Sequence, residues 1–399
     1  MRPTSRFILA GALLLGTTLL TRAAVTVGST NVQIGGFFSQ GYLKSSKNNH
    51  PFEAKDGTWD FREMAVNVST TIGTHLRVGA QGFAQKLGNY GRDEVLLDWA
   101  NADYNFRPEF GVRAGRIKYP KGLYGEALDV DAIRPFIFLP NNIYSVVRRD
   151  FSASFDGAMF YGSLNAKQAG SFDYKLFYGD IAMSPKQGVA DLFNNANLFA
   201  APGVQSLSVE KVYGVAIDWS TPLSGLKIHA SYSKLDQAVA TGRFLAVPAL
   251  PLRAEVSPAY TTVGAEYTRG DWTLAAEYMH EDGPVAYQTQ PASVFSVARQ
   301  YGTRNYYASV ARRFGEKWEL GAYYAKAKNA HPAATDPEPA RHLDDWAFAI
   351  RYNVNEHVIV KAEFHTIDGR YNVINTPRTP NPTLADSMSF WALKTTFVF

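Results

Sequence analysis

One pattern runs from Val32 to Phe399: apolar or aromatic residues alternate with polar or small ones, in stretches of about ten residues. Residues 272–278, which read Trp-Thr-Leu-Ala-Ala-Glu-Tyr, show it clearly. Successive side chains of a β-strand point to opposite faces, so a period of two predicts strands rather than helices. The chain is therefore expected to be all-β.

The alternation predicts about sixteen strands, an even number as in bacterial single-chain barrels. All prolines fall outside these strands, as expected for strands paired on both sides. The predicted strands are Val32–Tyr42, Trp59–Thr70, Leu76–Leu87, Val95–Phe106, Phe110–Lys118, Phe151–Leu164, Phe172–Asp180, Ser208–Trp219, Leu226–Leu235, Ala259–Arg269, Trp272–His280, Arg304–Phe314, Trp318–Lys328, Asp344–Tyr352, Val358–Asp368 and Ser387–Phe399.

The apolar face of these strands differs from the core of a soluble protein. It is rich in Ala, thin in Ile and Val, and bracketed by aromatic residues, of which the chain has 25 Phe, 22 Tyr and 7 Trp. A mean hydropathy of −0.19, with no apolar run of ~18 residues beyond the N-terminal stretch, argues against membrane helices. The strands instead predict a transmembrane antiparallel β-barrel with aromatic residues at the two lipid interfaces.

The connections between predicted strands alternate between short and long. Tight turns at one end of a barrel, on the periplasmic side, and long outer loops at the other give this rhythm. A sandwich or propeller has no reason to sort its loops in this way. Only the outer connection at 88–94 is brief; the long ones are expected at about 43–58, 119–150, 181–207, 236–258, 281–303, 329–343 and 369–386.

The first residues have the organisation of a secretory signal peptide. Arg2 and Arg6 form a charged start, and the apolar stretch that follows them is too short for a bilayer core of ~30 Å. Small residues follow, so residues 1–23 are expected to be removed and residues 24–399 to form the barrel. An N-terminal membrane anchor is the alternative. Removal would leave 37 of the 40 basic residues against 36 acidic ones, which is close to neutral.

Composition and spacing exclude several kinds of chemistry. The chain has no Cys, hence no disulfide scaffold, thiolate zinc site or Cys nucleophile, and its balanced charge gives no support for a nucleic-acid partner. Its eight His form no pair at metal-binding spacing, and there is no Gly-x-Ser-x-Gly motif. Asp336 and Glu338, like Asp129 and Asp131, lack the other ligands of a recognised cation loop. No enzyme, cofactor or metal site is predicted, although a Ser–His pair meeting across strands stays open.

The C-terminal strand carries a more specific signal. Residues 390–399 read Phe-Trp-Ala-Leu-Lys-Thr-Thr-Phe-Val-Phe, with Phe397 and Phe399 on one face. Together with the signal peptide, the strands and the sorted loops, this ending resembles the Gram-negative general porins along essentially the whole mature chain. The resemblance implies that the barrel-assembly machinery reads Phe397 and Phe399. It also implies a homotrimer that is integral to the outer membrane, among its lipid and lipopolysaccharide.

In porins the third long loop folds inward and narrows the channel, so the resemblance implies this role for residues 119–150. Its acidic candidates are Glu126, Asp129 and Asp131. Opposed charges across a narrow gap make a transverse field that orients dipolar solutes. The basic candidates for the opposite wall are Arg77, Arg113, Arg116, Lys118, Arg148 and Arg149.

The same loop contains an apolar run, Phe136, Ile137, Phe138 and Leu139, between two prolines. In water this run would be an exposed apolar patch, and packing against the inner wall removes that cost. A contact between subunits of a trimer is the alternative. Further polar residues are expected to face the lumen: Asn101, Asp103, Ser154, Asp156, Asp173, Lys175, Glu266, Arg351, Lys361, Glu363 and Lys394.

The predicted function is a passive pore for small hydrophilic solutes and ions, with the third loop setting size and charge preference. A substrate-selective porin, for an anion such as phosphate, a sugar or an organic acid, is the alternative within transport. A barrel enzyme is disfavoured by the missing motifs. A surface-recognition scaffold would need residues 119–150 to point outward.

Overall fold

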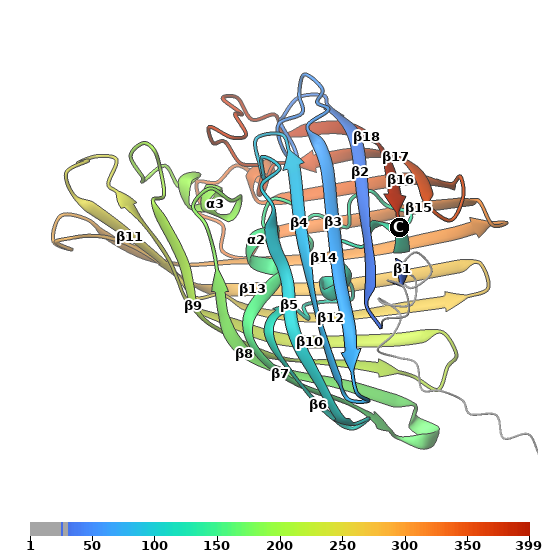
Figure 1. The fold of residues 1–399 in the computed structure, drawn as a ribbon. Helices are drawn as coiled ribbons and strands as arrows, with labels where there is room; N and C mark the ends of the chain where they lie inside the picture. The colour runs from blue at the N-terminus through green and yellow to red at the C-terminus, as the bar shows by residue number, and fades with distance from the viewer. Residues whose placement is uncertain (1–24, 27–30) are drawn as a thin grey trace, which may run out of the picture.

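The computed structural model describes residues 25–26 and 31–399; the predicted signal peptide, residues 1–23, lies outside them. Sixteen antiparallel strands form a closed barrel, in which β18 pairs with β2, as predicted (Figure 1). Phe399 and Gly36 complete the closure by exchanging backbone hydrogen bonds of 2.8 and 3.0 Å. The barrel strands are β2 (Gln33–Ser45), β3 (Phe61–Ile72), β4 (Leu76–Leu87), β5 (Leu96–Arg107), β6 (Phe110–Lys118), β7 (Ser154–Asn165), β8 (Ser171–Ala182), β9 (Ser206–Ser220), β10 (Leu226–Arg243), β12 (Ala259–Arg269), β13 (Trp272–Thr289), β14 (Ser296–Phe314), β15 (Trp318–Asn329), β16 (His342–Asn353), β17 (Val358–Gly369) and β18 (Ser387–Val398).

Short elements complete the described fold. β1 (Val25–Thr26) pairs with β2, and β11 (Pro251–Val256) pairs with both β10 and β13. Within the described ranges, no helix combines the length and the apolar character needed to cross a bilayer. The helical segments are η1 (Gly125–Ala127), η2 (Asp131–Ile133), α2 (Arg149–Ser152), η3 (Lys167–Ala169), α3 (Val189–Asn194) and η4 (Glu338–Ala340).

Most of the barrel strands have one apolar, exposed face and one more buried face. On β16, Trp346, Phe348 and Ile350 are about half exposed, whereas the intervening Ala347 and Ala349 are buried. An exposed face of large apolar side chains is unfavourable in water and favourable in lipid. The face that alternation marks as apolar is therefore the outer surface of the barrel, and the small and polar residues face inward.

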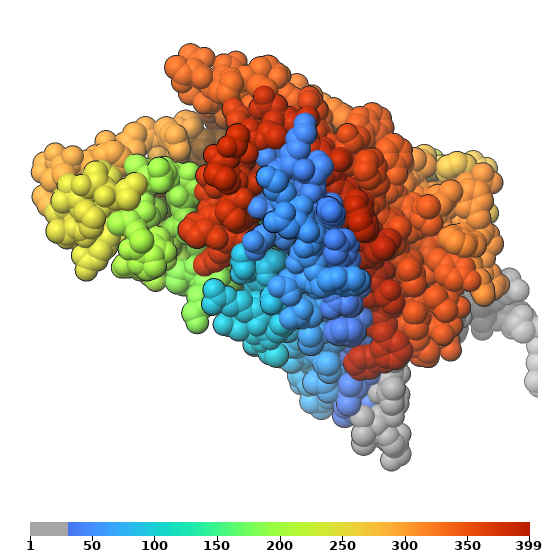
Figure 2. Space-filling view, turned by 90° about the horizontal axis from the view of Figure 1, so that it is seen from above, coloured from blue at the N-terminus to red at the C-terminus, as the bar shows by residue number. Residues whose placement is uncertain are grey.

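Two of the predicted outer loops, 236–258 and 281–303, are largely strand, so their prediction was wrong. β10, β13 and β14 continue beyond their predicted ends, and with β11 they project at one side of the barrel in Figures 1 and 2. Pro251 and Pro284 favoured loops because proline lacks the N–H of a paired strand. Both nonetheless occupy strand positions here, Pro284 opposite Gln300 of β14. The backbone register thus continues through the prolines.

The segment after β6, residues 119–150, lies inside the ring of strands (Figure 1). Its Tyr119, Phe136 and Tyr144 belong to a buried apolar cluster with residues of β7, β8, β10 and β13–β16. Its Ile137 and Phe138 belong to a second cluster with residues of β2–β4 and β15–β18. We call residues 119–150 the inner loop, and its contacts with the wall define the candidate site.

Candidate functional site

The inner loop crosses the barrel interior and is tied to several walls. Near its start, the Tyr119 hydroxyl donates to the Ser233 hydroxyl of β10 at 2.7 Å. The N–H of Leu123 donates to the Glu277 carboxylate of β13 at 2.7 Å. Its middle reaches β17, where the Glu363 carboxylate accepts the N–H groups of the apolar run. The loop therefore lies across the lumen rather than above it.

Asp131 joins the inner loop to the seam between β17 and β18. Its carboxylate lies 2.9 Å from the Lys361 ammonium and 3.8 Å from that of Lys394, and accepts the Thr396 hydroxyl at 2.7 Å. Burial alone would raise the pKa of Asp131, but the two ammonium groups hold it well below its usual range. Asp131 is therefore ionised and held by charge as well as by hydrogen bonds.

Asp129 forms a second anchor of the inner loop, on the side of β5 and β6. Its carboxylate lies 2.5 Å from the Lys118 ammonium and 2.6 Å from the Arg149 guanidinium. Both cations also contact Asp98 of β5, at 2.7 and 2.8 Å. Burial opposes ionisation, but Arg149 and Lys118 outweigh it and lower the pKa of Asp129. Arg149 also lies 3.7 Å above the ring of Phe83.

Glu126 begins a row of alternating charges along the wall. It contacts the Lys175 ammonium of β8 and lies 4.0 Å from the Arg113 guanidinium of β6. Lys175 is 3.3 Å from Asp218 of β9, which in turn lies 2.7 Å from the His229 ring of β10. These groups form direct ion pairs and hydrogen bonds along the wall. Glu126 is thus held by direct contacts with cations of the wall, and not by a field between charges on opposite sides of the lumen.

The apolar run packs against the inner wall. The Phe138 ring stacks on Phe61 of β3 at 5.3 Å and meets Phe390 of β18 edge-on at 5.8 Å. Phe136 meets Tyr323 of β15 at 5.1 Å. Phe136, Phe138 and their neighbours in the run are at most 6% exposed. These aromatic contacts bury the apolar run inside the barrel, where its side chains are shielded from water.

A buried polar chain holds the backbone of this run. The Glu363 carboxylate accepts the N–H groups of Ile137 and Phe138 at 2.6 and 3.2 Å. The same carboxylate lies 2.7 Å from the His365 ring, and this ring lies 2.9 Å from Asp345 of β16. Glu363 was among the predicted lumen residues, but His365 and Asp345 were not singled out as a pair. The only sequence signal for His365 and Asp345 was that each occupies an inward-facing position of its strand. Their contact depends on how the two strands are aligned, which the sequence pattern does not give.

The remaining basic candidates do not reach the acidic side chains of the inner loop. Arg77 donates to the Ser69 hydroxyl at 3.2 Å, Arg116 pairs with Asp156 at 3.3 Å, and Arg148 lies 3.6 Å from Glu281. The structure thus brings Lys118, Arg149 and Arg113 to the loop carboxylates. Sequence reasoning missed Asp98 of this charged network.

Other outer loops close over the inner loop. Asp191 of α3 accepts the Tyr90 hydroxyl at 2.8 Å and the Thr376 hydroxyl at 3.1 Å, and it lies 3.3 Å from Arg378. These contacts join the segments that follow β4, β8 and β17. Below them lies a cavity of about 40 Å³, whose lining includes His50, Asn142, Arg148, Asp345 and Tyr371.

A closed sixteen-stranded barrel with an outward apolar face is the architecture of the Gram-negative porins. Solved structures share this fold at low identity. The outer-membrane expressed OmpT of Vibrio cholerae matches with 13% identity over 94% of this chain and 100% of that one, with a TM-score of 0.58. OmpF of Salmonella typhi, in complex with daunomycin, matches with 13% identity over 94% and 100%, with a TM-score of 0.59. The anion-selective porin of Comamonas acidovorans matches with 12% identity over 93% and 100%, with a TM-score of 0.55.

Comparisons by sequence give nothing further. No family model matches the chain, and no curated protein does.

Proposed function

We propose that the chain forms a water-filled channel through the outer membrane for passive diffusion of small hydrophilic solutes. The observation that carries the proposal is the inner loop, which crosses the lumen and is tied to the wall through Lys175, Lys361 and Lys394. We expect a loop anchored in this way to leave a passage of constant width between itself and the rest of the wall. Size selection by that passage follows from its fixed width.

The charged wall beside the inner loop supports weak rather than strong charge preference. Glu126, Asp129 and Asp131 each lie within 4.0 Å of at least one lysine or arginine. Paired charges cancel at a distance and leave only short-range dipoles for a passing ion. Small neutral and charged solutes are both expected to pass.

The role of Arg113 is testable with a matched control. Arg113→Ala removes a cation that pairs with Asp103 of β5 at 2.8 Å and lies 4.0 Å from Glu126 of the inner loop, whereas Arg116→Ala removes one whose partner is Asp156, away from the loop. We expect the reversal potential in a salt gradient to shift toward cation preference for Arg113→Ala and to stay near wild type for Arg116→Ala. An unchanged reversal potential in both variants would remove Arg113 from the selectivity assignment.

An anion-preferring channel is the second candidate, and two arginines favour it. Among the described residues, neither Arg77 nor Arg134 has a carboxylate within ion-pair distance. Arg77 contacts Ser69, and Arg134 donates to the backbone oxygen of Leu128 at 3.1 Å. Of the two, Arg134 belongs to the inner loop, and a cation without an ion-paired carboxylate at a constriction favours anions. A clear anion preference in wild type, reduced by Arg134→Gln, would select this candidate over the unselective pore.

Several further assignments belong to the same proposal. The N-terminal residues 1–23 direct export, Phe397 and Phe399 are read during barrel assembly, and three copies of the chain associate in the membrane. The outward position of the Phe397 ring, 6.1 Å from that of Phe399, supports the second of these. Residues 119–150 act in passage rather than in catalysis, so the chain is not an enzyme.

A further inference from the structure

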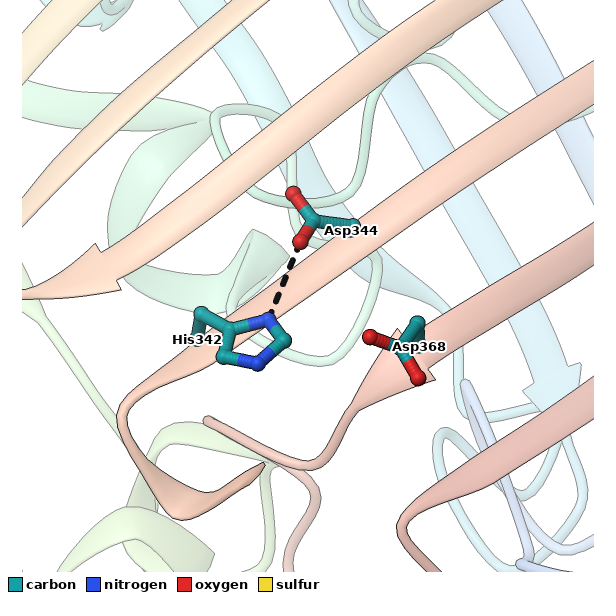
Figure 3. A group of neighbouring side chains, drawn as sticks. All are labelled: His342, Asp344 and Asp368. Atoms are coloured by element: carbon teal, nitrogen blue, oxygen red, sulfur yellow. Dashed lines mark ion pairs between the residues drawn. The ribbon is translucent and has the colours of Figure 1, made fainter. Parts of the chain in front are cut away.

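Three potential metal ligands meet at the outer end of β16 and β17, away from the inner loop. Asp344 and Asp368 lie directly opposite each other in the register of these strands, and His342 lies two residues before Asp344 on the same face. Figure 3 shows the imidazole and the two carboxyl groups turned toward one another. This is the outward face, because Trp346, the next residue on it, is about half exposed.

The distances suit a shared ion. One ligand atom from each of His342, Asp344 and Asp368 lies within 4.8 Å of the other two. His342 Nδ1 lies 3.0 Å from a carboxylate oxygen of Asp344. A metal bound at 2.0–2.2 Å from each atom would need only small side-chain rotations at this exposed rim.

The hydrogen bonding of His342 leaves one ring nitrogen free for a ligand role. Nε2 lies 3.0 Å from the Glu338 carboxylate of η4, which accepts a hydrogen bond from the Nε2–H group. Nδ1 is buried and has no hydrogen-bond partner, although the Asp344 oxygen is close. In the neutral ring, this places the Nδ1 lone pair against a carboxylate lone pair. A carboxylate on the far nitrogen is the usual partner of a metal-bound histidine, because it fixes the tautomer.

The groups around these three side chains also carry more negative than positive charge. Two like charges opposite each other on a sheet destabilise it. Lys326 of β15 offsets part of this repulsion, because its ammonium lies 2.7 Å from Asp344. The neighbouring Arg370 pairs with Asp386 at 3.3 Å. Three carboxylates, those of Glu338, Asp344 and Asp368, thus meet Lys326 and, opposite His342 in the register, Lys328, which leaves a negative excess that a divalent cation offsets.

We propose that His342, Asp344 and Asp368 bind a divalent transition-metal ion, with Glu338 positioning the imidazole. One imidazole nitrogen with carboxylate oxygens suits zinc or manganese rather than calcium, which takes oxygen ligands alone. The bound ion would join β16, β17 and the loop that carries Glu338 at the outer rim. Sequence spacing did not indicate this group, since its residues come from two strands and a loop.

Calorimetric titration of the refolded, detergent-solubilised chain with zinc chloride tests the proposal. We expect one zinc per chain, and at least about tenfold weaker binding for His342→Gln and for Asp368→Asn. Glu338→Gln should weaken binding by about 10-fold, because the imidazole loses the carboxylate that fixes its tautomer. Asp368 is exposed, so its variant is expected to fold normally.

Two variants serve as controls. His357→Gln changes an exposed histidine in the turn between β16 and β17, and Asp386→Asn changes an exposed carboxylate beside β18. Both should bind zinc as wild type does. Zinc binding that is equal in wild type and Asp368→Asn, or no binding below about 1 mM zinc, would overturn the assignment. Either result leaves the channel proposal untouched, because these residues lie outside the lumen.

Discussion

At the residue scale, Glu363 links the barrel wall to the inner loop. Its carboxylate accepts two backbone N–H groups of the loop and contacts His365, and all of these groups are buried. A buried donor that loses its acceptor costs about 1–3 kcal/mol, which is more than an intact hydrogen bond gains. Glu363 is therefore expected to control how firmly the loop is held.

Glu363→Gln should loosen the inner loop. An amide offers one acceptor oxygen in place of two, so at least one of the N–H groups of Ile137, Phe138 or the His365 ring loses its partner. We expect unfolding free energy to fall by about 1–3 kcal/mol and single-channel current to become noisier. Glu316→Gln, in an exposed turn, is the control. Wild-type current noise in Glu363→Gln would show that the loop is held without this carboxylate.

Asp150, at the end of the inner loop, gives a pH-dependent prediction. Burial raises its pKa from 3.8 to about 7, and the N–H of Val189, at 3.3 Å, only partly offsets this. The folded chain therefore keeps a proton that the unfolded chain releases, so this group lowers stability as pH rises from about 4 to 7. Asp150→Asn should remove that loss, roughly 4 kcal/mol at most. Urea unfolding in lipid between pH 4 and 8 measures the slope; an identical slope in wild type and variant would contradict the assignment.

At the element scale, the sequence predicted the strands well and their tertiary contacts poorly. Alternation placed β2–β8 within a few residues, because each strand has one lipid face. It ended the strand that begins at Trp272 at His280, before Pro284, whereas the register continues through this proline. Asp129 and Asp131 were predicted as site residues, yet their partners Lys118, Lys361 and Lys394 depend on how a loop crosses the lumen. The path of the loop across the lumen cannot be predicted from the alternation of apolar and polar residues within each strand.

The apolar run of the inner loop gives an element-scale prediction. Phe138→Ala removes a ring that packs on Phe61 and Phe390, and a cavity of this kind costs about 3–5 kcal/mol. We expect this loss in unfolding free energy together with a larger channel conductance, because the loop loses its main apolar contact. The control is Phe160→Ala, whose ring is 47% exposed on the outer face. Equal effects of the two substitutions would contradict the special role of the run.

At the scale of the whole molecule, the closed barrel explains where the apolar and the charged residues lie. The apolar residues form mainly an outer surface, and a large share of the charged ones pair inside it. A mean hydropathy near zero, which excludes membrane helices, is the expected average for a wall with one apolar and one polar face. The fold is thus recoverable from the sequence, whereas the width of the passage is not.

Planar-bilayer recording of the refolded wild-type chain tests the central claim most directly. If the chain is a channel narrowed by the inner loop, current should rise in discrete steps, with a linear dependence on voltage at low potential. Membranes that stay without stepwise conductance, despite insertion of folded barrel, would contradict it.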